Sequence, residues 1–151
     1  MTRTQLRELA IHISFAQGAN YHFADELFAD FFDETYYQSL AEEEALYENY
    51  PQSKNERAYL ETLVKGLSEH IVELDFYIEK YAQGWKLGRI SRVLVAIMRV
   101  SMYEILYMPD IPNASSINDA VEIAKKYEEP EAVSFLNGVL GSFLKGEFGE
   151  A

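Results

Sequence analysis

Apolar residues recur at three- and four-residue spacing along most of the chain, which is the pattern of amphipathic helices. The spacing predicts a first helix that Thr2 or Thr4 can cap and that ends by Gly18. A second helix is expected at about 21–37, where the apolar stripe is aromatic. The acidic and polar residues 38–54 suit an exposed connection or a short helix.

The second half of the chain continues the helical pattern. From Asn55 it predicts two helices with a break near 66–68. The most apolar segment, 89–108, contains β-branched residues, but its length favours a central helix over a buried strand. The run 115–119 is similar to a capping box and predicts the start of the next helix, and Pro130 suits the first turn of the last one.

The chain contains no strand alternation, hairpin dipeptide or fixed-period repeat, so the predicted fold class is all-α, a bundle of six to seven helices. The last helix holds Asn137 and Gly138 among apolar positions. A glycine inside a helix costs about 0.5–1 kcal/mol relative to alanine. We therefore expect another helix to approach closely here, and Gly138→Leu to destabilise the fold.

Composition and charge narrow the class of protein. A chain of 151 residues suits one domain, and no apolar run approaches the length of a membrane span. Charged residues interrupt the N-terminal apolar positions, which favours a cytoplasmic location over secretion. The formal net charge is −12, but it is uneven: acids dominate 25–61, whereas bases dominate 84–108. A negative body repels nucleic acid at long range, and the basic segment qualifies that repulsion.

The residues that catalysis or metal binding needs are not assembled into any motif. The three histidines, His12, His22 and His70, stand alone, and cysteine is absent. The sequence has no metalloprotease motif, no nucleophile elbow and no phosphate-binding glycine loop. We therefore predict a protein that is not an enzyme, with no catalytic residues, metal site or cofactor.

Six linked segments of the sequence stand out: RELA at 7–10, WKLGRI at 85–90, MRVSMYEI at 98–105, PDIP at 109–112, INDAVEIAK at 117–125 and FLNGVL at 135–140. Together they resemble the NusB family of bacterial transcription antitermination factors, in the family's order. The resemblance covers residues 1 to about 17 and 60–145, and the acidic stretch between them is not diagnostic.

This resemblance implies an all-helical domain over 1–151, with an N-terminal helical subdomain at about 1–83 and a C-terminal one at about 84–148. It also implies a partner, the ribosomal protein NusE. The pair is expected to bind the single-stranded boxA element of nascent RNA within the transcription elongation complex, together with other Nus factors. Ribosomal RNA operons are the expected setting. No reaction is implied.

The resemblance also implies RNA-binding residues. Arg3 and Arg7 stand where the family has an arginine-rich N-terminus, and Phe135 matches an aromatic position near RNA. Charge alone adds Lys86 and Arg89 as phosphate neighbours. The competing interpretations are core packing for Phe135 and surface ion pairs for the cations. Because two N-terminal arginines are few, we expect the heterodimer with NusE to be the RNA-binding unit.

Two other functions fit the same residues. The first is a protein-only adaptor that keeps the fold and the partner surface but does not bind RNA. The second is a detached NusB-like domain of a ribosomal RNA cytosine methyltransferase, although this chain has no room for the cofactor-binding domain that such an enzyme needs. The sequence leaves both a monomer and a homodimer open.

Overall fold

The structure is a computed structural model that describes residues 2–17, 54–85 and 87–149. All the secondary-structure elements assigned in these ranges are helices, so the predicted all-α class is confirmed. The chain divides into two compact units, Met1–Glu69 and His70–Ala151. The helix expected at 21–37 and almost all of the segment 38–54 lie outside the described residues.

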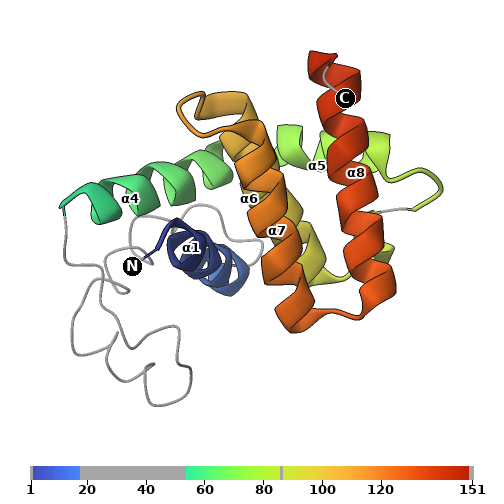
Figure 1. The fold of residues 1–151 in the computed structure, drawn as a ribbon, viewed down its shortest axis with the longest axis horizontal. Coiled ribbons are helices and arrows are strands. Elements are labelled where there is room, and N and C mark those ends of the chain that lie inside the picture. The colour runs from blue at the N-terminus through green and yellow to red at the C-terminus, as the bar shows by residue number, and fades with distance from the viewer. Residues whose placement is uncertain (1, 18–53, 86, 150–151) are drawn as a thin grey trace. The chain divides into compact units, whose positions relative to one another are not determined.

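The first unit contains α1 (Arg3–Gln17) and α4 (Lys54–Glu69), which pack together (Figure 1). A capping box begins α1: the Gln5 amide donates to Thr2 Oγ1 at 3.1 Å, and the Thr2 amide donates to Gln5 Oε1 at 2.9 Å. Among the described residues of this unit, the buried apolar ones are Leu6, Leu9, Ala10, Ile11, Tyr59, Leu60, Leu63, Val64 and Leu67. Their spacing is the one that predicted these helices.

The two helices expected after Asn55 are present, but the break between them is at His70 and not at 66–68. Gly66 is buried, and it lies within α4, so this glycine does not end the helix. His70 is non-helical, with φ −110° and ψ 13°, and its ring stacks on Tyr107 at a centroid distance of 4.2 Å. The break therefore lies where a side chain has a tertiary contact, which local propensity does not reveal.

The second unit packs four helices around one core: α5 (Ile71–Tyr81), α6 (Arg92–Tyr107), α7 (Asn113–Tyr127) and α8 (Pro130–Phe148). A short 3₁₀ helix, η3 (Leu87–Arg89), precedes α6. In Figure 1, α7 and α8 lie side by side and run in opposite directions. The fully buried residues include Leu74, Ile78, Met98, Met102, Ala124, Leu136, Leu140 and Phe143. Among the described residues, no helix combines the length and apolar character that crossing a membrane requires.

An ion pair joins α5 to α6 beside this core. Arg99 donates to both carboxylate oxygens of Asp75, from Nε at 2.7 Å and from a terminal nitrogen at 2.9 Å. Both side chains are about four-fifths shielded from solvent. Such a bidentate contact fixes the relative orientation of the two helices as well as contributing stability.

The ends of α7 and α8 correct one prediction and confirm another. The run 115–119 does not cap α7, because the helix has already begun at Asn113 and Ser116 is buried within it. The carbonyl of Pro112, the residue before the helix, accepts the amides of Ser115 and Ser116, at 3.0 and 3.2 Å. Pro130 does begin α8, as predicted, and Gly149 ends it in the left-handed region, with φ +69°.

The expected close approach at Gly138 is wrong. Asn137 and Gly138 are both exposed, and a Cβ added at Gly138 would meet nothing within 4 Å. The close approach occurs at Gly146, where an added Cβ would lie 2.7 Å from Cζ of Tyr81. The apolar residues around position 138 belong to the opposite face of α8, so Gly138→Leu has no steric reason to destabilise the fold.

Candidate nucleic-acid interface

A pocket of about 270 Å³ opens on the second unit where the start of α8 meets the turn before α6. Ligand pockets for drug-sized molecules are usually larger, so this one suits part of a ligand, such as a single ring system. The residues that line it are Trp85, Arg89, Ile90, Ser91, Leu94, Glu131, Ala132 and Phe135.

The backbone before the pocket presents Trp85 to solvent. Gly84 has φ +81°, which side chains disfavour, and the Trp85 amide donates to the Ala82 carbonyl at 3.0 Å. This turn ends the α5 segment and points the chain outward. The Trp85 side chain is consequently 53% exposed, which is high for a large aromatic residue.

Phe135 reaches the same pocket from the first turns of α8. The Glu129 carbonyl accepts the amides of Ala132 and Val133, at 3.0 and 3.1 Å, and so anchors the start of this helix. The Phe135 ring is half-buried and contacts the Trp85 indole edge-to-face, with centroids 5.8 Å apart and planes at 60°. Segments fifty positions apart in the sequence thus build one aromatic wall.

The pocket rim carries mixed charge. Arg89 is exposed at the end of η3, and its side chain has no hydrogen-bond or ion-pair partner among the described residues. Glu131 is exposed on the α8 side of the same pocket. Ser91 donates to Glu128, which ties the start of α6 to the turn between α7 and α8. Arg89 thus faces solvent beside an apolar floor, an arrangement that suits one phosphate next to one base.

The structure brings together two of the five predicted RNA-binding residues, Arg89 and Phe135. Lys86 lies outside the described residues. Arg3 and Arg7 belong to the first unit. Arg3 is exposed, and its guanidinium lies 4.5 Å from the centroid of the Tyr59 ring.

Arg7 differs from the other predicted arginines because its side chain is only 2% exposed. The neighbouring Glu8 is buried as well, at 4%. A buried guanidinium is stable only where other groups satisfy its charge, so contact with RNA would require Arg7 to leave its present position. Its contribution to RNA binding therefore stays a prediction.

Trp85 is the residue that sequence reasoning about the site did not single out. A signal was present, since a glycine precedes the only tryptophan of the chain in a segment between two predicted helices. Loops positioned by a rigid scaffold commonly carry binding residues.

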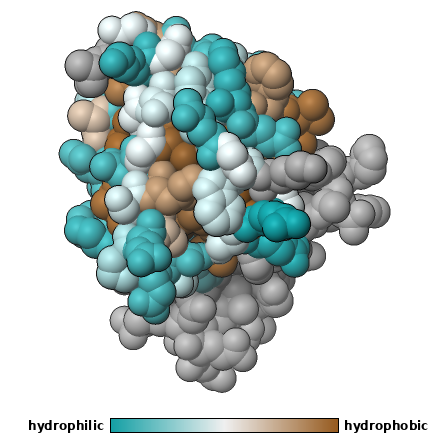
Figure 2. Space-filling view, turned by 90° about the vertical axis from the view of Figure 1, so that its right-hand side faces the viewer, coloured by the Kyte–Doolittle hydropathy of each residue, from teal (hydrophilic) through white to brown (hydrophobic). Residues whose placement is uncertain are grey.

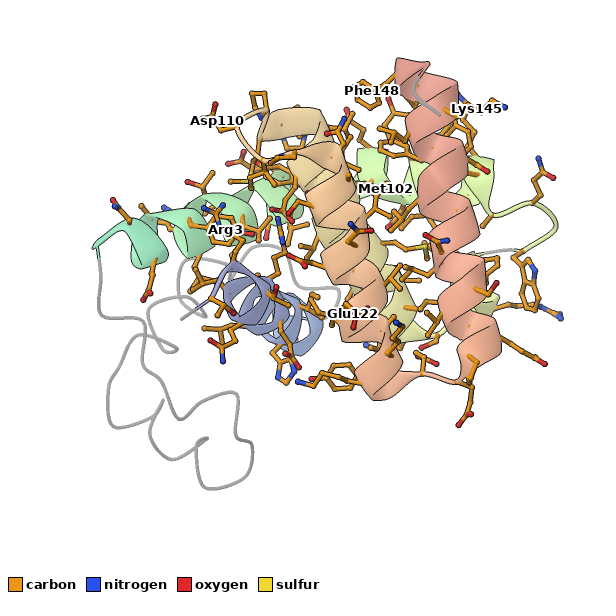
Figure 3. The ribbon with its side chains drawn as sticks, in the orientation of Figure 1. Arg3, Met102, Asp110, Glu122, Lys145 and Phe148 are labelled. Carbon is orange, nitrogen blue, oxygen red and sulfur yellow. The ribbon has the colours of Figure 1, made fainter. Side chains whose placement is uncertain are left out.

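A second, larger groove of about 750 Å³ runs beside α7 and α8, and its lining includes the polar side chains of Asn118, Ser134 and Asn137. Its cation, Lys125, pairs with Glu122 on the same helix at 2.9 Å; Figure 3 labels Glu122 on α7. The pairing neutralises the charge that a phosphate would need. In the described part of the chain, no three metal-ligating side chains cluster.

Exposed apolar residues extend beyond the pocket. Figure 2 shows one face of the molecule, where hydrophobic surface appears in patches among hydrophilic side chains. In the described ranges, the large exposed hydrophobic residues are Val72, Phe76, Trp85, Tyr107, Tyr127 and Phe148.

Comparisons with known proteins agree with the fold and with the family resemblance. The NusB family profile matches residues 4–145. The transcription antitermination protein NusB of Clostridium kluyveri is 32% identical over 152 residues, a match that covers 97% of each chain. That of Acetivibrio thermocellus is 46% identical over 98 residues, covering 65% of this chain and 68% of its own.

Solved structures give the same result. T. maritima NusB aligns with a TM-score of 0.71 and 27% identity, over 96% of this chain and 92% of that one. A chain in a crystal structure described as a plectonemic RNA supercoil aligns with a TM-score of 0.76 and 25% identity, over 99% and 98%. Since the family match spans nearly the whole sequence, this protein belongs to the NusB family and is a transcription antitermination factor, not an enzyme.

Proposed function

We propose that this protein pairs with NusE and that the pair binds single-stranded boxA RNA on nascent transcripts, notably those of ribosomal RNA operons. There it would act in the cytoplasm, in the elongation complex with other Nus factors. The observation that carries the RNA-binding part is the pocket formed by Trp85, Arg89 and Phe135. A relative of similar fold occurs in a crystal structure described by its RNA, which supports the same assignment.

The charge distribution supports a shared RNA site. Each phosphate neutralised on a single strand contributes a slope of about −0.7 to the salt dependence of binding, so tight binding at physiological salt needs many cations. This chain has a net charge of −12, and within the part that the structure describes the exposed arginines are Arg3, Arg89 and Arg92. A basic partner would supply the missing contacts, and an acidic body would attract it.

A surface on α5 supports the protein partner. Val72 is 80% exposed and Phe76 is 61% exposed, and their four-residue spacing places them on one side of the helix. Glu73 and Glu79 belong to the same helix. Exposed apolar residues near acids suit a partner whose interface is apolar at the centre and basic at the rim.

Fluorescence anisotropy of a labelled boxA-type RNA tests the proposal, with this protein alone, NusE alone and both together. We expect weak binding by each protein and tight binding by the pair, with a scrambled RNA of equal length as the control. Equal tight binding by this protein alone would contradict the shared site. No sequence-dependent binding by the pair would contradict the RNA function.

The burial of Arg7 favours a second candidate, a protein-only adaptor, because it removes one of the two N-terminal arginines from solvent. A pull-down of NusE before and after ribonuclease treatment separates the two. The adaptor predicts that NusE is recovered while the anisotropy of boxA RNA stays unchanged.

A further inference from the structure

We infer that Trp85 is the residue on which an RNA base stacks, and that Phe135 is a positioning residue that holds the indole in place. The inference rests on the proposed RNA-binding function and assigns the role within the pocket. It reverses the sequence-based expectation, in which Phe135 is the stacking residue.

The distance between the two rings excludes a base between them. Aromatic carbon atoms in contact are about 3.5–4.0 Å apart, so a base held between two rings needs a separation of about 7–8 Å. The centroids of Trp85 and Phe135 are 5.8 Å apart, and their planes meet at 60°. A base must therefore stack on the outer face of one ring.

Exposure decides which ring that is. Trp85 is 53% exposed, whereas Phe135 is more deeply buried, in the wall of the pocket. The indole is also the larger π surface. Phe135 packs against it edge-to-face, the geometry that aromatic pairs prefer, so it restricts the rotation of the indole without covering both of its faces.

The backbone and the nearby charge support the same assignment. The turn at Gly84 holds Trp85 at a fixed place on the scaffold, which lowers the entropy lost on binding. The exposed guanidinium of Arg89 lines the same pocket and can contact the phosphate next to a stacked base. Stacking platforms beside cations are the usual construction of single-strand binding sites.

The first test uses the intrinsic fluorescence of Trp85, the only tryptophan of the chain. The protein–NusE pair is titrated with boxA-type RNA, and the same titration of a pair carrying Trp85→Phe gives the background from NusE. We expect RNA to quench the difference signal with the same midpoint as the anisotropy. An unchanged difference signal at saturating RNA would overturn the inference.

The second test compares Trp85→Leu with Phe135→Leu, which replace either ring by an apolar side chain. Trp85→Leu should weaken RNA binding by the pair about 5- to 150-fold, the effect of losing one stacked base. Phe135→Leu should retain more affinity, because leucine still fills the pocket wall. Phe148→Ala is the matched control: Phe148 is 42% exposed, contacts Phe143 edge-to-face, and lies at the other end of α8 (Figure 3).

The outcomes separate the inference from the proposed function. If the unmodified pair binds boxA RNA and Trp85→Leu binds equally well, Trp85 is not the platform, and the RNA function stands. If Phe135→Leu loses affinity and Trp85→Leu does not, the roles are the reverse of those inferred. If the unmodified pair shows no sequence-dependent binding, the proposed function itself fails. Thermal melting of each variant confirms that it is folded.

Discussion

Gly138 and Gly146 both lie in α8, in opposite surroundings. Gly138 faces open space, whereas Gly146 lies against the ring of Tyr81. The hydroxyl of Tyr81 donates to Glu147, the residue that follows Gly146. The tyrosine is therefore held where a Cβ at position 146 would have to go. The same residue type therefore has no steric function at one position and a packing function at the other.

The two alanine substitutions should change stability in opposite directions. Gly138→Ala should stabilise the protein by about 0.5–1 kcal/mol, because it lowers the flexibility of the unfolded chain without a clash. Gly146→Ala should destabilise it by about 1–3 kcal/mol, the usual cost of overpacking, since Tyr81 must move. Denaturant unfolding of both variants measures the difference, and a stabilising Gly146→Ala would contradict the packing at Tyr81.

At the residue scale, the sequence predicted correctly that most apolar side chains of the last helix are buried. It did not predict what surrounds Gly138 or Arg7. The apolar positions around Asn137 and Gly138 that predicted the last helix include Leu136 and Leu140, and both are fully buried. The helical spacing could not tell that Gly138 is exposed, because an interfacial glycine and an exposed glycine have the same neighbours in the sequence. Arg7 is a similar case, since its burial depends on contacts distant from its own segment.

At the scale of elements, a small polar cluster joins α5 to α8. Lys80 donates to Glu147 at 2.7 Å, and Tyr81 donates to the same carboxylate oxygen. These hydrogen bonds hold the pKa of Glu147 below its ordinary value of 4.5, and they raise the pKa values of Lys80 and Tyr81. The contact is therefore strongest when Glu147 is ionised and both donors keep their protons.

The stabilising effect of Glu147 should depend on pH. A carboxylate with a lowered pKa in the folded state stabilises the protein above about pH 4.5, and this effect is lost as the pH falls through its folded pKa. Glu147→Gln should thus melt at a lower temperature than the unmodified protein at pH 7. The difference should shrink below pH 4.5. Melting curves followed by circular dichroism at several pH values test this, and a difference that grows in acid would exclude the mechanism.

Helix existence was more predictable than helix ends. The period of the apolar residues predicted α1, α4, α5, α6, α7 and α8. The predicted start of α7 was wrong because the helix already begins at Asn113, after Pro112, and no side-chain hydrogen bond caps it. The pocket could not be predicted from the apolar period, since Trp85 and Phe135 meet only after α5, α6 and α8 have packed.

At the scale of the whole molecule, the two units have their own buried residues. The helices α5, α6, α7 and α8 all belong to the second unit, 70–151, and pack against one another within it. Its buried residues include Met98, Met102 and Phe143, all at 0% exposure. A core of this kind is what allows a segment to fold as a domain.

We therefore expect residues 70–151, produced alone, to be helical and to unfold cooperatively. In that fragment Leu140→Ala should cost about 2–5 kcal/mol, the loss expected for a fully buried leucine. Circular dichroism with urea unfolding measures both quantities. A fragment that unfolds without a cooperative transition would show that the second unit depends on the first.

The glycines of α8 also bear on the order in which the molecule assembles. Gly138, Gly141 and Gly146 each disfavour a helix by about 1 kcal/mol relative to alanine, so this segment should not hold a helix by itself. Leu136, Leu140 and Phe143 must reach an existing surface of α5, α6 and α7 before α8 becomes stable. A ribosome that pauses before Pro130 would hold a second unit with its apolar interior open to water, a state that chaperones recognise and proteases attack.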